Sequence, residues 1–207
     1  GARLAMQLSL LRAAVLARMG LPSTDARLDS ATLNRCVNDA LHAIEVIDDW
    51  AWLEAAPADI ATVSGTSEYT PTAGWMRTID LRVNGRVPLA RRDIEDVDLL
   101  LGASGDPVFY AIFNEKIVLA PVPNSVLTIK HRYIKTEPDL SADADTPLLP
   151  AAWNSALIVL AACYGHRILN QLAEAKVCAE DFAEWEARLK ARAPRASSSE
   201  GGGVAQG

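Results

Sequence analysis

Three histidines and three cysteines are the residues of this sequence best suited to metal or nucleophilic chemistry. A metal site needs several of them at short ligand spacing, such as His-x-x-x-His or Cys-x-x-Cys. Instead they lie far apart, at Cys36, His42, His131, Cys163, His166 and Cys178. We therefore expect no metal site, no cofactor and no disulfide framework, and we interpret the cysteines as small apolar helix residues.

The segment Gly102–Asp106 resembles a nucleophile elbow around Ser104. In that motif the second glycine stands two residues after the serine, whereas Gly105 follows Ser104 directly. No buried strand is predicted before it, so we interpret the segment as a turn. The sequence thus favours a protein that is not an enzyme, with a small cytoplasmic hydrolase as the enzyme-class alternative.

Carboxylate residues are clustered in two stretches of the sequence. One group could be imagined as an acid–base or cation site, but consecutive carboxylates without an apolar pocket are typical of a solvated helix start. This group is Asp93, Glu95, Asp96 and Asp98, and we interpret it as an acidic channel or surface face. The second group, Asp139, Asp143 and Asp145, is equally available for that role and lacks the glycine and distal glutamate of a calcium loop.

Composition narrows the class of protein. The chain has 207 residues, of which 50% are apolar and 22% charged, close to soluble globular averages. A net charge of −6 argues against a protein whose main role is to bind nucleic acid, because phosphate binding needs a concentrated basic face. The uncharged apolar stretch Ala151–Ala162 is too short for a bilayer, so we expect no membrane span. The N-terminus shows no secretory pattern, so we expect the chain to stay in the cytoplasm where it is made.

A helical period of apolar residues marks the N-terminal part of the chain. Residues 4–19 place apolar side chains at steps of three and four and predict a first helix. Residues 33–47 predict a second helix, capped by Asp29 or Ser30 and ending near Trp50.

The same period returns over residues 153–189, as one helix or as two with a break between 170 and 174. Residues 194–207 are rich in Ser and Gly and predict a C-terminal tail or docking arm. The candidate docking residues are basic or Gly: Arg188, Lys190, Arg192, Arg195, Gly201, Gly202 and Gly203.

Between the helices the period is two, which predicts strands. Asn84–Gly85 and Asn114–Glu115 are expected to turn two hairpins. The expected strands are 76–83, 86–89, 108–113, 116–120 and 127–135, with a short helix over 93–101.

The order helix, helix, sheet, helix, helix predicts an α+β fold. We expect an antiparallel helical bundle from the N- and C-terminal helices, with an inserted antiparallel β layer. The expected parts are N-terminal helices at 1–57, a β-rich insert at 58–149, C-terminal helices at 150–193 and a tail at 194–207.

A set of aromatic, Gly and Pro positions from Leu28 to Leu189 resembles the head-to-tail adaptor (connector) proteins of tailed bacteriophages. The set comprises Trp50–Leu53, Ile60–Tyr69, Asp80–Leu81, Pro88–Leu89, Gly105–Ile112, Ile117–Pro123, Tyr133, Leu140, Asp143, Asp145, Pro147 and Leu149–Pro150.

This resemblance implies a structural virion protein, made in the host bacterial cytoplasm and located in the neck between capsid and tail. It implies a ring, commonly of twelve copies, that binds below the portal protein, extends the DNA channel and offers a platform to tail or neck proteins. DNA would pass through without specific binding. A monomeric protein-binding module is a further alternative.

Overall fold

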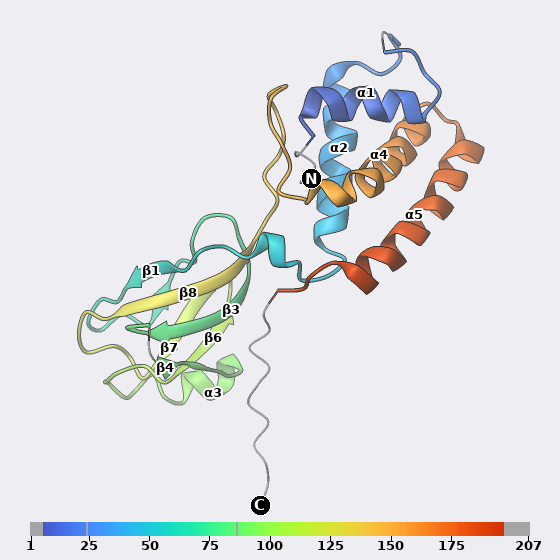
Figure 1. Cartoon of the computed structure of the whole chain (residues 1–207). Coiled ribbons are helices and arrows are strands. Elements are labelled where there is room, and N and C mark those ends of the chain that lie inside the picture. The colour runs from blue at the N-terminus through green and yellow to red at the C-terminus, as the bar shows by residue number, and fades with distance from the viewer. Residues whose placement is uncertain (1–5, 24, 86, 197–207) are drawn as a thin grey trace, which may run out of the picture. The chain divides into compact units, whose positions relative to one another are not determined.

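The computed structural model describes residues 6–23, 25–85 and 87–196, which form two compact units (Figure 1). The helical unit joins the residues up to Leu53 with Thr136–Ala196, and the sheet unit is Glu54–Lys135. The α+β class predicted from the sequence is confirmed. No helix within the described ranges has both the length and the apolar character needed to span a membrane.

The helical unit is centred on α4. Its elements are α1 (Leu8–Arg18), α2 (Ser30–Glu45), η1 (Ala51–Leu53), η2 (Ala151–Trp153), α4 (Asn154–Ile168) and α5 (Leu172–Arg192). Helix α4 contacts α1, α2 and α5, and its apolar and small residues are buried on most sides. At Gly165 an added Cβ would lie 2.7 Å from the Met19 sulfur, so a glycine allows the end of α1 to approach α4 closely.

The ends of these helices follow from local hydrogen bonds. Of the two predicted caps of α2, Asp29 or Ser30, the structure has Asp29, whose carboxylate accepts from the Thr32 N–H at 2.7 Å. Helix α2 ends at Glu45, earlier than the predicted end near Trp50, because the chain turns and the Trp50 indole donates to the Ile44 carbonyl at 2.8 Å. Helices α4 and α5 are separate, with Asn170 between them at φ 56°.

The start of the first helix differs from the sequence expectation of residues 4–19. Helix α1 begins at Leu8, and residues 1–5 lie outside the described ranges. The Leu8 N–H donates to the Asp145 carbonyl at 2.8 Å and the Ser9 N–H donates to the Asp143 carbonyl at 3.2 Å. Backbone carbonyls of a distant segment thus satisfy two of the unpaired N–H groups of the helix start.

The sheet unit consists of two four-stranded sheets. One has the strand order β1 (Ala58–Ala61), β8 (Thr128–Lys135), β3 (Trp75–Val83), β4 (Val87–Pro88). The other has the order β2 (Glu68–Tyr69), β7 (Lys116–Ala120), β6 (Phe109–Phe113), β5 (Ala90–Arg91). Buried side chains from both sheets form one core, so the sheets face each other: Tyr69, Leu81, Leu89, Tyr110, Ile117, Leu119 and Ile129.

Both predicted hairpins are present. The turn residues Asn84 and Gly85 have φ of 49° and 72°, and Asn114 and Glu115 have φ of 47° and 58°. Two successive residues with positive φ match the twist of the flanking antiparallel strands, which explains why these positions turn the chain.

The structure differs from the predicted antiparallel layer in two respects. Strand β5 pairs with β6 in parallel, and the strands divide between two sheets. A parallel pair needs a crossover, which here contains the short helix α3 (Ile94–Asp98). Val97 of α3 packs on Ala111, Val118 and Ala120, the face of the second sheet that points away from the shared core.

Candidate functional site

The predicted basic docking residues lie in the last turns of α5 and just after it. Arg188 lies 3.4 Å from Glu184, and Lys190 lies 2.6 Å from Glu186, each one helical turn earlier. Arg192 is exposed. Because carboxylates offset the charges of Arg188, Lys190 and also Arg195, which pairs with Asp48, this helix end is less cationic than its sequence suggests.

The three residues that end the described chain are fixed to the segment after α2. Two backbone bonds run from Ala51 N to Pro194 O (3.0 Å) and from Ala196 N to Asp49 O (2.6 Å). Between them, the Arg195 guanidinium lies 2.7 Å from the Asp48 carboxylate. Residues 194–196 are therefore fixed to the helical unit. Gly201, Gly202 and Gly203 lie outside the described residues.

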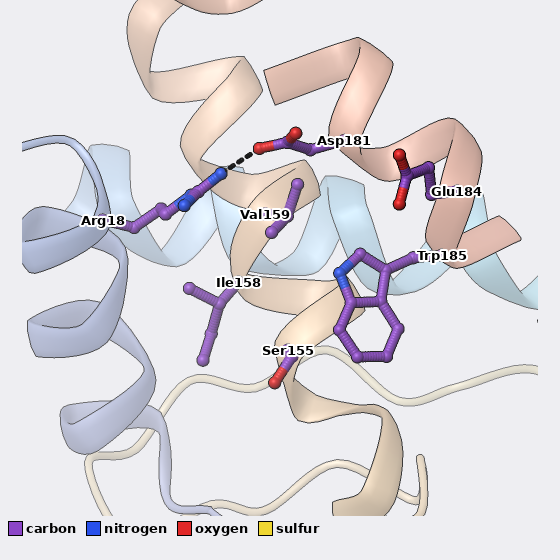
Figure 2. A pocket seen from close by; sticks show the side chains of 7 residues that line it. All are labelled: Arg18, Ser155, Ile158, Val159, Asp181, Glu184 and Trp185. Carbon is purple, nitrogen blue, oxygen red and sulfur yellow. Dashed lines mark hydrogen bonds and ion pairs between the residues drawn. The ribbon is translucent and has the colours of Figure 1, made fainter. Parts of the chain in front are cut away.

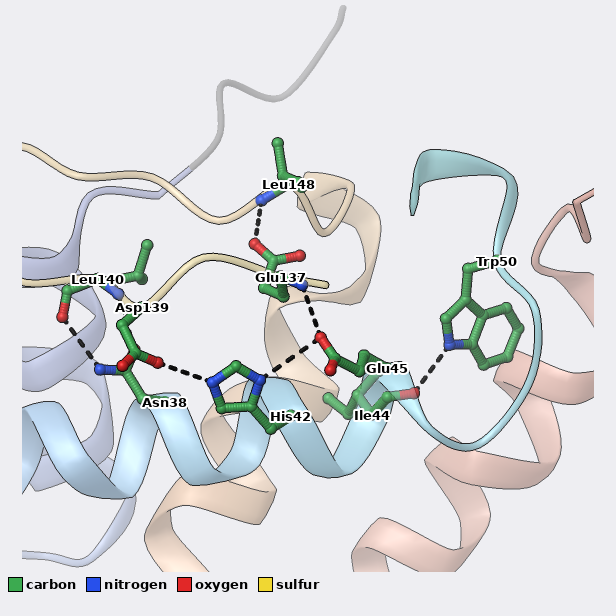
Figure 3. Close-up of polar contacts among 9 residues, drawn as sticks. All are labelled: Asn38, His42, Ile44, Glu45, Trp50, Glu137, Asp139, Leu140 and Leu148. Carbon is green, nitrogen blue, oxygen red and sulfur yellow. Dashed lines mark hydrogen bonds and ion pairs between the residues drawn. The ribbon is translucent and has the colours of Figure 1, made fainter. Parts of the chain in front are cut away.

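Segment 136–150, which connects β8 to η2, is bound to α2 by side chains (Figure 3). The Asn38 amide donates to the Leu140 carbonyl at 3.1 Å and its oxygen accepts from the Leu140 N–H at 3.0 Å. The buried Glu45 carboxylate accepts from the Glu137 N–H at 2.7 Å. This long connection is consequently a fixed part of the helical unit.

His42 lies on α2 between two carboxylates (Figure 3). Its Nε2 lies 2.7 Å from Asp139 Oδ1, and its Nδ1 lies 3.4 Å from Glu45 Oε2. The hydrogen bond to Asp139 and the nearby Glu45 charge raise the pKa of His42 above its ordinary value. His42 therefore joins segment 136–150 to α2 most strongly when it is protonated.

The two predicted acidic groups differ in their surroundings. All four carboxylates of the first group are exposed on α3 or beside it, at Asp93, Glu95, Asp96 and Asp98. In the second group, Asp143 pairs with Arg12, and Asp145 accepts the N–H groups of Ser141 and Ala142 at 2.8 and 2.7 Å. These bonds lower the pKa of Asp145. The second group therefore holds segment 136–150 together and is not a free acidic face.

A groove of about 380 Å³ opens in the helical unit between α1, α4 and α5 (Figure 2). Arg18 of α1 reaches across to Asp181 of α5, and the indole of Trp185 lines the opposite part. The remaining lining residues are Ser155, Ile158, Val159 and Glu184. An ion pair and one aromatic ring in an open groove supply contacts for a partner but hold no nucleophile beside a base.

The other two histidines and the three cysteines are buried in the interior. His131 is fully buried in the sheet unit, 3.0 Å from the Thr78 hydroxyl, and burial lowers its pKa to about 4. His166 lies 2.8 Å from the Gln171 side-chain oxygen. The three cysteines are buried as free thiols, and burial raises the pKa of Cys36 to about 11.

Within the part of the chain that the structure describes, no group of three or more His, Cys, Asp or Glu side chains is placed to hold a metal ion. Ser104 lies in a loop that forms a bridge with Val122 and is exposed.

The two units together define a protein of the α+β class. Comparison with family models supplies the family: the model described as SU10 adaptor protein matches residues 6–206. The chain belongs to this family, and the resemblance to phage head-to-tail adaptors predicted from the sequence is confirmed. A search among curated proteins found no match.

Proposed function

We propose that this chain is a structural virion protein that forms a head-to-tail ring of twelve copies in the neck of a bacteriophage. The ring binds below the portal protein, extends the DNA channel and provides the platform for tail or neck proteins. The observation that carries the proposal is the family match over residues 6–206, which spans both units. A closed ring uses two different side surfaces of each copy.

In this proposal the helical unit is the rigid body of the ring subunit, with its terminal helices arranged as an antiparallel bundle. The burial of α4 among α1, α2 and α5 supports a rigid role. The anchoring of segment 136–150 by Asn38 and Glu45 supports it further, since an unanchored connection would leave the unit open at one side.

The C-terminal arm, residues 194–207, is proposed to dock on the portal or on an adjacent copy. Anchoring of Pro194 and Ala196 at Asp49–Ala51 supports a fixed point of departure. The docking residues are Arg188, Lys190, Arg192, Arg195, Gly201, Gly202 and Gly203. Since Arg188, Lys190 and Arg195 each pair with a carboxylate, electrostatic attraction contributes less than four free cations would.

DNA is proposed to pass the ring without specific binding. A negatively charged lining repels phosphates and limits sticking, whereas a basic lining binds them in a salt-dependent way. The exposed carboxylates Asp93, Glu95, Asp96 and Asp98 supply such a face, either in the channel or on the outer surface. Titration of the purified chain with duplex DNA at physiological salt should show no submicromolar affinity.

Electron microscopy tests the proposal. Purified full-length chain is mixed with the portal protein of the same phage, and intact particles are imaged in parallel. We expect a ring on the tail-facing side of the portal and matching density in the neck. Particles that lack the chain, or a portal that recruits no ring at micromolar concentration, would refute the proposed function.

A further inference from the structure

Three loops of the sheet unit contain no charged residue, although 22% of the chain is charged. They are residues 62–67, 99–105 and 121–127, and together they are called the loop end here. Strand β8 begins beside the loop end at Thr128 and finishes at Lys135, where Glu54 pairs with Ile134. The loop end thus lies opposite the place where the chain enters and leaves the unit.

Backbone hydrogen bonds join the three loops into one surface. The Gly65 N–H donates to the Pro123 carbonyl at 2.8 Å. On the other side, the Gly105 N–H donates to the Val122 carbonyl at 2.9 Å, and the Val122 N–H donates to the Ala103 carbonyl at 3.0 Å. Residues 121–127 therefore form the centre, with the other two loops on either side.

Buried side chains fix the shape of this surface. The Thr62 hydroxyl, almost fully buried, donates to the Ser125 carbonyl at 2.9 Å and accepts from the Leu127 N–H at 2.7 Å. The Tyr69 hydroxyl accepts from the Val63 N–H at 3.1 Å and donates to the Thr66 carbonyl at 2.7 Å. Loops ordered before contact lose less entropy on binding, which favours a preformed docking surface.

Three apolar side chains on these ordered loops are nevertheless exposed to solvent. Val63 is 58% exposed, Leu99 84% and Val126 76%. Exposed apolar side chains grouped on an ordered surface mark interaction sites more often than isolated ones do.

The charged residues that adjoin the three loops in sequence are acidic, and they select the class of partner. Glu68, Asp98 and Asp106 directly follow or precede the three loops in sequence, and all three are exposed. An acidic rim repels the phosphates of DNA and of anionic lipids. It also disfavours two copies meeting through the same end, since their acidic rims would face each other. It attracts a protein surface whose apolar centre is bordered by Lys and Arg.

We propose that the loop end docks an uncharged, apolar segment of a different virion protein, bordered by basic residues. The assignment of that partner to the virion rests on the proposed function.

Charge insertion tests the surface in full-length chains that complement particles lacking the wild-type protein. Val63→Asp and Val126→Asp are each expected to lower the yield of infectious particles at least tenfold. Asn114→Asp adds the same charge at the exposed β6–β7 turn and should stay within twofold. Thermal melting monitored by circular dichroism confirms that the variants fold. Equal losses in all three folded variants, or no loss at Val63 and Val126, would overturn the proposal.

Charge reversal tests the partner chemistry in the same assay. Asp106→Lys should lower the yield at least threefold, whereas Glu115→Lys at the opposite turn should not. A benzophenone crosslinker at position 126 in assembled particles should link the chain to another virion polypeptide. Links only to a second copy, or none in particles that contain the chain, would refute a heterologous partner.

Two further measurements, vesicle binding and the protein content of particles, show whether the docking proposal or the proposed function is wrong. Binding of the purified wild type to phosphatidylcholine vesicles, lost in Val126→Asp, would overturn the docking proposal in favour of lipid. Purified wild-type particles without the chain would contradict the proposed function itself. Failure of the docking surface alone would instead be seen in particles that contain the chain.

Discussion

Asn38 on α2 forms two hydrogen bonds with the backbone of Leu140, a residue 102 positions later in the chain. The amide side chain reproduces the donor and acceptor pattern of a neighbouring strand. Asn38→Ala should lower the free energy of unfolding by about 2 kcal/mol, because the backbone N–H and carbonyl of the buried Leu140 both lose their partners. Urea unfolding followed by tryptophan fluorescence measures the loss. Asn124→Ala, at an exposed loop position, serves as the control and should change stability by less than about 0.5 kcal/mol.

The second prediction concerns the pH dependence of the His42 contacts. Since the pKa of His42 is raised in the folded protein, its stabilisation is fully present below the ordinary value near 6.5 and is lost as pH rises through the raised pKa. The partly exposed ring limits this effect to less than about 1 kcal/mol. Wild type and His42→Gln should therefore differ more in unfolding free energy at pH 6 than at pH 8.5. A constant difference across this range would contradict the assignment.

The third prediction concerns His131, whose buried Nδ1 has no hydrogen-bond partner among the described residues. Its pKa is lowered to about 4, so folding excludes a proton that the unfolded chain binds below pH 6.5. Stability should fall progressively from pH 6.5 to pH 4, by roughly 3 kcal/mol in all. An NMR titration should show one imidazole, assigned by its loss in His131→Gln, that stays neutral at pH 5. An ordinary titration near 6.5 would disprove the burial argument.

The fourth prediction concerns Trp50, which is fully buried, stacks on Trp52 with ring centroids 4.8 Å apart, and donates to the Ile44 carbonyl. Trp50→Phe removes the donor and leaves a buried carbonyl without it, at a cost of about 1–3 kcal/mol. Trp52→Phe is the matched control, because no indole hydrogen bond at the end of α2 is lost. Chemical denaturation should rank Trp50→Phe clearly below Trp52→Phe.

The fifth prediction separates folding from docking at the C-terminus. Truncation after Ala193 removes the bonds of Pro194 and Ala196 to Asp49–Ala51 and should lower stability by about 1–2 kcal/mol. Truncation after Ala196 keeps those bonds and should melt like the full chain. If this second truncation also assembles on the portal as well as the full chain does, residues 197–207 contribute nothing to docking.

Local signals explain what could be predicted from the sequence. Asp29 precedes the stripe of α2, and the two hairpin turns carry residues that tolerate positive φ, so each feature is encoded within a few neighbouring residues. The family resemblance likewise rests on short segments in order.

Long-range contacts explain what could not be predicted. Strand β5 covers only Ala90–Arg91, both exposed, so no alternation of buried residues reveals it or its parallel partner. The binding of segment 136–150 depends on Asn38 and Glu45 meeting residues about a hundred positions away. From the sequence, Asp143 and Asp145 look like free acidic residues. The partner of Asp143 is an arginine distant in sequence, and the partners of Asp145 are backbone N–H groups that only the folded turn brings to it.

The entry and exit of the sheet unit lie side by side, because Glu54 pairs with Ile134 and the Ala55 N–H donates to the Tyr133 carbonyl at 3.0 Å. Because the two ends of this insert lie next to each other, another domain whose termini lie equally close can replace it without stretching the chain on either side. The adjoining ends of residues 54–135 thus predict that a chimera, carrying a foreign domain with equally near termini between Leu53 and Thr136, should still fold.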